Sequence, residues 1–166
     1  MPPFDFDVDV LRQSFALVVD RNEDVVRRFF AHLFDRYPST VELFGGRTPN
    51  KKHHRMLARA LIVFVEHLDH DEWLGEQLDL LGARHVDYGV EDHMYDWVGE
   101  CLILAFSEAA AELWTQEAED AWRLAYDTIR RMVLQGTFRR RLELASKRSA
   151  EIAGVEPVTL RWDERG

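Results

Sequence analysis

The residues of this sequence best suited to bind a metal or a cofactor are two histidines, each on the apolar side of a predicted helix. The first ends a stripe whose members are four, three and four positions apart: Leu74, Leu78, Leu81 and His85. This spacing places them on one side of a helix, so His85 points toward the interior. A buried imidazole needs partners for its nitrogens. Two interpretations stay open, a core histidine bonded to a backbone carbonyl and a ligand of a metal or cofactor.

The second histidine lies near the start of the preceding predicted helix. That helix is expected to begin with Thr48 as its N-cap and Pro49 in its first turn, and to end near Leu68. Its predicted inner stripe consists of His53, Leu57, Ala60 with Leu61, Phe64 and Leu68, with His54 at the edge of the stripe. Its other side is basic and carries Lys51, Lys52, Arg55 and Arg59.

Composition limits the class of protein. A chain of 166 residues with 46% apolar residues predicts one domain with a substantial core, and its nineteen Trp, Tyr and Phe residues could line a pocket for a large flat ligand. The net charge of −9 argues against nucleic acid as the main partner. The single cysteine, Cys101, excludes a disulfide within the chain and a multi-cysteine metal cluster. We see neither a membrane span nor a signal peptide and expect a cytoplasmic protein.

Apolar periodicity predicts about seven helices and almost no strand. The expected segments are 8–19, 22–36 with Asn22 as N-cap, 39–43, 48–68, 71–87, 91–113, and a last helix capped by Thr115. Gly136 is expected to weaken this last helix, with a mostly polar helix continuing to Gly154. Apolar and polar residues alternate within 156–166, which predicts either a short strand or an extended tail.

Two inward histidines from neighbouring helices suit a haem better than a lone metal ion. An ion bound by protein alone usually has three or four protein ligands. A porphyrin supplies four nitrogens itself, so the protein needs to provide only axial ligands.

The sequence resembles the globins over residues 5–138, specifically the branch of bacterial single-domain haemoglobins and flavohaemoglobin haem domains. Several short motifs occur in the order and spacing of that branch. They are Phe29-Phe30 with Phe34 and Pro38, then Phe44, then Arg84-His85, then Tyr95 followed by Val98-Gly99-Glu100, and finally Asp120-Ala121-Trp122.

The resemblance implies an all-α globin fold of seven to eight helices around a haem pocket. It implies a globin domain at 1–138 and a C-terminal helical extension and tail at 139–166. The implied cofactor is haem b, iron protoporphyrin IX, with His85 as the proximal iron ligand and Phe44 wedged against the porphyrin. His53 is then the distal residue over the sixth coordination position.

Four further positions take roles from the same resemblance. Phe30 falls at the distal site, and Leu57 falls one turn after the distal histidine. Arg84 could pair with a haem propionate, although a solvated surface charge explains it equally well. Tyr95 could contact His85 or Glu100.

The sequence departs from the branch at three points. Flavohaemoglobins typically place Tyr and Gln where this chain has Phe30 and His53. Their glutamate that bonds the proximal histidine matches a position near Arg139, which puts a strongly electron-donating proximal side in doubt. The sequence also has no Gly-rich dinucleotide-binding turn, so sustained oxidation of nitric oxide would need an external reductase.

Three functions remain as hypotheses. The first is a haem globin that reversibly binds a diatomic gas (oxygen, nitric oxide or carbon monoxide), with nitric oxide oxidation as an additional activity. The second is a redox or gas-sensing globin with His53 and His85 both on the iron. The third is a cofactor-free globin-fold signalling module, for which the basic residues from Arg130 to Arg148 would be a docking surface or merely a solvated helix face. A homodimer is left open.

Overall fold

The computed structural model describes residues 4–154, which contain six α-helices, three 3₁₀ helices and no strand. In chain order they are α1 (Val8–Ala16), η1 (Val19–Arg21), α2 (Asn22–Arg36), η2 (Pro38–Phe44), α3 (Lys51–Glu66), α4 (Asp71–Asp87), α5 (Met94–Ala110), η3 (Ala111–Leu113) and α6 (Gln116–Ala153). The all-α prediction is confirmed for this range, and the predicted strand or tail at 156–166 lies outside the described residues. No helix in 4–154 combines the length and apolar character needed to cross a bilayer.

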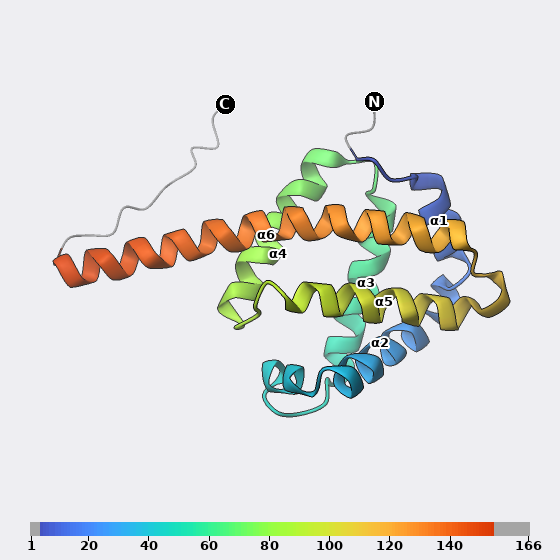
Figure 1. Cartoon of the computed structure of the whole chain (residues 1–166), viewed down its shortest axis with the longest axis horizontal. Coiled ribbons are helices and arrows are strands. Elements are labelled where there is room, and N and C mark those ends of the chain that lie inside the picture. Colours follow the sequence, from blue (N-terminus) through green and yellow to red (C-terminus); the bar gives the residue numbers. More distant parts are fainter. Residues whose placement is uncertain (1–3, 155–166) are drawn as a thin grey trace.

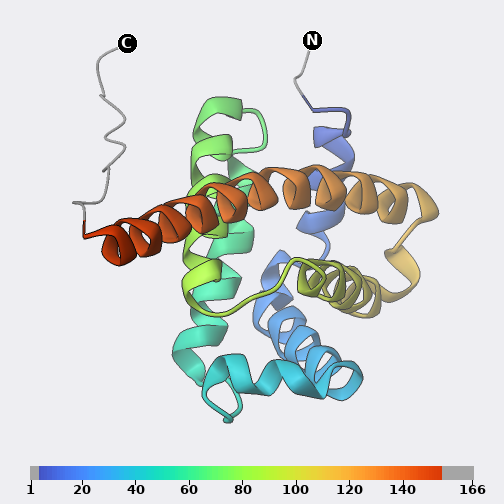
Figure 2. The ribbon, with the colours of Figure 1, turned by 60° about the vertical axis from the view of Figure 1, so that its left-hand side comes forward.

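Crossing pairs of helices build the body of the molecule. α4 packs on α6, α2 packs on α5, and α3 packs on α2, while the C-terminal part of α6 extends beyond the other helices (Figure 1, Figure 2). The main core includes Leu11, Val25, Leu68 and Phe106, which come from different segments and are almost completely buried. α3 and α4, the two predicted histidine-bearing helices, therefore have different main neighbours.

Two glycines allow the close crossing of α4 and α6. A Cβ added to Gly136 would lie 2.0 Å from the backbone oxygen of Asp79, and one added to Gly82 would lie 2.1 Å from the backbone oxygen of Val133. Gly136 was expected to weaken the last helix, yet α6 runs through it without interruption. The reason is the neighbouring helix, whose close packing compensates for the entropic cost of glycine.

The predicted start of the histidine-bearing helix α3 was wrong by two residues. Asn50, not Thr48, is the N-cap, and its side chain accepts a hydrogen bond from the backbone N–H of His53. Asn22 is not an N-cap either; it is the first residue of α2, and its buried side chain donates to the Ala58 carbonyl at 2.7 Å, joining α2 to α3. The predicted cap at Thr115 is confirmed.

Two residues assigned to apolar inner faces are exposed, and the predicted helix 91–113 ends early. Ala60 faces solvent on α3, and Leu81 is 36% exposed on α4. Leu113 is 64% exposed because α5 ends at Ala110, where the backbone of Ala111 turns to a φ of 51° and the chain enters η3.

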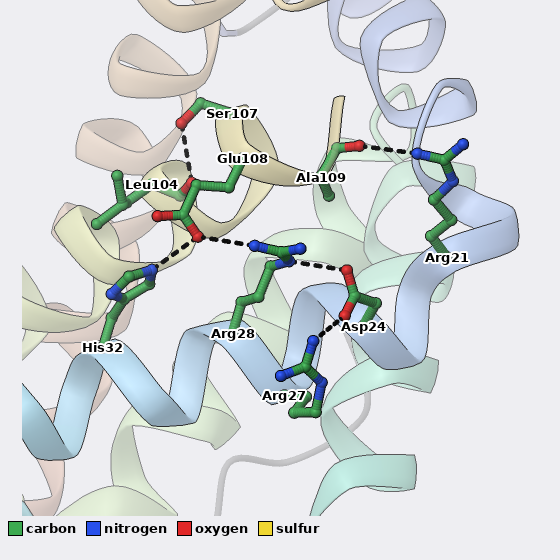
Figure 3. Close-up of polar contacts among 9 residues, drawn as sticks. All are labelled: Arg21, Asp24, Arg27, Arg28, His32, Leu104, Ser107, Glu108 and Ala109. Carbon is green, nitrogen blue, oxygen red and sulfur yellow. Dashed lines mark hydrogen bonds and ion pairs between the residues drawn. The ribbon is translucent and has the colours of Figure 1, made fainter. Parts of the chain in front are cut away.

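An ionic network joins α2 to the end of α5 (Figure 3). Arg28 donates from Nε to Asp24 at 2.8 Å and from Nη1 to Glu108 at 3.3 Å, and Nε2 of His32 lies 2.9 Å from the same carboxylate. These contacts lower the pKa of Glu108, chiefly through the hydrogen bond with His32, and lower that of Asp24, chiefly through Arg28. The network fixes α2, which carries Phe30 on another side.

Candidate functional site

His85 lies in the last turn of α4, with one ring nitrogen bonded and the other available. Its Nδ1 lies 2.7 Å from the backbone oxygen of Leu81, one turn earlier. A carbonyl oxygen only accepts hydrogen bonds, so Nδ1 carries the proton and Nε2 keeps its lone pair. Burial lowers the pKa of His85, which favours the neutral ring. This is the protonation state and tautomer of a histidine that binds a metal through Nε2.

Two tyrosines flank His85. The ring centroid of Tyr88 lies 5.9 Å from that of the imidazole, and the ring of Tyr95, at the start of α5, lies 6.1 Å away. The Tyr95 hydroxyl is buried and has no hydrogen-bond partner among the described residues. Burial raises the pKa of Tyr95 to about 12, so the hydroxyl stays neutral. A buried donor without a protein partner fits a site that receives a further group.

A cluster of phenylalanines occupies the end of α2 and the end of η2. Phe30 is buried and lies 5.8 Å from Phe34 and 5.6 Å from Phe44, measured between ring centroids. Phe34 and Phe44 meet edge to face at 5.7 Å. The structure therefore brings Phe30 and Phe44 together.

Two consecutive histidines of α3 reach this cluster. The ring of His53 lies 5.7 Å from Phe44, and its Nδ1 lies 2.9 Å from Oδ1 of Asn50, so this side chain also forms part of the helix cap. His54 stacks on Phe30, with ring centroids 5.0 Å apart. Sequence reasoning named His53 and placed His54 at the edge of the stripe. The pairing of His54 with Phe30 depends on how α2 crosses α3, which no sequence pattern indicated.

The remaining predicted site residues lie in different settings. Leu57 is half-buried and packs against the main core. Arg84 is exposed and has no ion pair within residues 4–154. Arg139 binds Asp79 on α4 at 2.6 Å and Glu143 at 2.7 Å, so its partners are carboxylates and not the imidazole of His85.

These side chains match the chemistry of a haem site. His85 offers one neutral nitrogen lone pair, as a porphyrin-bound iron requires of its axial ligand. The aromatic residues of α2 and η2 offer apolar surface for a flat macrocycle, and the imidazoles of α3 offer donors or a second ligand. Within 4–154, no group of three His, Cys, Asp or Glu side chains could hold a bare metal ion.

Comparisons with known proteins agree with this geometry. The globin family model matches residues 27–133. The chain is 31% identical over 90 residues to a flavohemoprotein of Bordetella pertussis, a match that covers 54% of this chain and 22% of that protein. The chain therefore matches about a fifth of the length of this curated relative.

Two solved structures share the fold. One is an engineered carbene transferase, named as a proposed nitric oxide dioxygenase from Rhodothermus marinus, with a TM-score of 0.73 and 24% identity over 83% of this chain and 95% of that one. The other is a bacterial globin from Campylobacter jejuni, with a TM-score of 0.66 and 20% identity over 80% of this chain and 94% of that one. Together with the family match over most of the chain, they establish that this protein belongs to the globin family.

Proposed function

We propose that this globin binds one haem b without a covalent bond and reversibly binds a diatomic gas. The observation that carries the proposal is the Nδ1 hydrogen bond of His85 to the Leu81 carbonyl, which leaves the lone pair of Nε2 for an iron atom. Covalent attachment is not expected, because the sequence has no Cys-x-x-Cys-His motif and its one cysteine, Cys101, is buried.

Different side chains of the site would hold the haem and its ligand. The haem supplies an iron that binds the gas and exchanges one electron. Phe30, Phe34 and Phe44 would keep water away from the distal side. His53 would donate a hydrogen bond to the bound gas, since Phe30 has no hydroxyl to do so.

Nitric oxide oxidation is the activity that we propose in addition. It consumes one electron per turnover, and the sequence has no Gly-rich turn that would bind a dinucleotide as the electron source. The similarity to flavohemoproteins supports a reductase as the source of this electron.

A second candidate function is a redox or sensing globin in which His53 and His85 both bind the iron. The observation in its favour is the distal set itself: two imidazoles and three phenylalanine rings, with no hydroxyl that would hold another ligand. A neutral imidazole is then the strongest base near the sixth position.

Titration of the purified protein with haemin tests the proposal. We expect saturation at one haem per chain, a pyridine haemochromogen spectrum of the b type, and a carbon monoxide complex after reduction with dithionite. If the protein binds no haem from a stoichiometric excess of haemin, the proposal is refuted and the cofactor-free module is favoured.

A further inference from the structure

The solvent-facing side of α3 is strongly basic. Between Glu42 and Glu66 the sequence has no acidic residue, although the whole chain has a net charge of −9. We use the term basic face of α3 for its exposed residues together with the cation that precedes the helix: Arg47, Lys51, Lys52, Arg55, Met56, Arg59 and Ala60. A local positive field on an acidic protein attracts negatively charged partners.

The cations of this face are not paired with carboxylates among the described residues. None of its five Lys and Arg side chains forms an ion pair with any described residue. The arginines of α6 differ, since each of Arg130, Arg131, Arg139, Arg140 and Arg141 pairs with an aspartate. The positive charge of α6 is therefore largely neutralised internally, whereas that of α3 is available to a partner.

The basic face of α3 also has an apolar centre. Met56 is 61% exposed and has Lys52 and Arg59 one turn away on either side along the helix. Ala60 is exposed beside it. An apolar, adaptable centre with a charged rim is typical of a surface that binds proteins.

A cleft of about 620 Å³ adjoins this face, between α3 and α2. Its lining combines cations of α3 with residues of α2: Glu23, Asp24, Arg27, Pro49, Lys51, His54 and Arg55. Asp24 contributes little free negative charge, because Arg27 and Arg28 both pair with it. His54 connects the cleft to the site, since its ring stacks on Phe30.

The position of α3 links this face to the site. The same helix presents His53 and His54 to the phenylalanine cluster. A helix with its side chains is about 10 Å across, so a partner bound on the basic face would lie about one helix diameter from the distal side.

We propose that the basic face of α3 docks the protein that supplies electrons to this globin, an acidic one-electron donor of the flavoprotein or iron–sulfur class. This inference rests on the proposed function. The donor loses one electron and the ferric iron of the haem gains it, with no other bond made or broken. Charge complementarity would steer the encounter and make its rate depend on salt.

Stopped-flow reduction of the haem-loaded protein by a reduced plant-type ferredoxin, an acidic [2Fe–2S] one-electron donor, provides the test. The wild type is compared with Lys52→Glu/Arg59→Glu and with a control of equal charge change, Lys147→Glu/Arg148→Glu, at the far end of α6 (Figure 1). At low ionic strength we expect the α3 variant to be reduced about tenfold more slowly than the wild type. The control should stay within about twofold, and the difference should shrink as salt screens the charges.

The outcomes separate this inference from the proposed function. A protein that takes up haem but shows equal rates for wild type and the α3 variant at low salt overturns the docking site and leaves the haem function intact. Failure to take up haem overturns both. If the α3 substitutions abolish binding of a DNA duplex in a gel-shift assay without changing the ferredoxin rate, the face binds nucleic acid and the proposed partner is wrong.

Discussion

The imidazole of His54 stacks on the ring of Phe30, with centroids 5.0 Å apart and planes inclined by 29°. His53 is held differently, because its Nδ1 lies in the helix cap with Asn50 and its ring meets Phe44 edge to face. Packing therefore fixes His54, whereas the helix N-terminus fixes His53. The two adjacent histidines are not interchangeable.

Their difference predicts distinct spectra for two matched variants. In the haem-loaded protein without added gas, we expect part of the iron to be low-spin, with His53 as its sixth ligand. His53→Leu should remove most of this fraction, and His54→Leu should preserve it. Absorption and resonance Raman spectra of both oxidation states measure the fraction. If only His54→Leu changes the spectrum, His54 is the distal residue, and a high-spin spectrum in all three proteins would exclude a sixth histidine ligand.

The crossing of α4 and α6 predicts a large effect for a small substitution. Gly136→Ala places a methyl group 2.0 Å from the Asp79 backbone oxygen, so the helices must separate. We expect a loss of about 2–3 kcal/mol in the free energy of unfolding, as for overpacked cores. Gly75→Ala is the control, because its methyl group would meet only the flexible end of Met132 at 3.3 Å. Urea denaturation should find this control within about 1 kcal/mol of wild type, and equal losses for both variants would contradict the crossing.

The protonation of His85 predicts a pH dependence of the haem-free protein. Burial lowers the pKa of His85 in the folded state below its ordinary value of 6.5. As pH falls below 6.5, the unfolded chain binds a proton that the folded protein resists, so stability decreases, and above about pH 7 the effect is absent. Urea midpoints between pH 5 and 7.5 should show a shallower decline for His85→Gln than for wild type. Parallel curves would mean that His85 is not shielded from water.

Local patterns were enough to predict most of the helices, and the site residues remain predictions. Helical periodicity predicted that His85 points inward, and the resemblance to the globin branch named Phe30 and Phe44, which the structure brings into contact. Most predicted helix ends lie within a few residues of those observed, since caps such as Thr115 act over one turn.

The sequence alone could not predict features that arise between elements. Within its own helix, Gly136 looks only destabilising. The close approach of the Asp79 backbone from another helix explains why a glycine is needed there. The cap at Asn50 uses a histidine where a Glu or Gln is the usual partner, so it did not resemble a capping box. The stacking of His54 on Phe30 likewise depends on a helix crossing.

Haem affinity of two alanine variants tests the central claim most directly. If His85 is the axial ligand, His85→Ala should weaken haem binding by more than about 100-fold, because changes to residues that only support a ligand already cost 10- to 100-fold. His53→Ala should keep haem affinity within about tenfold of wild type, since His53 contributes at most a second, weaker bond. Transfer of haem to an excess of apomyoglobin measures both. A His85→Ala protein that stays fully loaded while His53→Ala loses its haem would contradict the assignment.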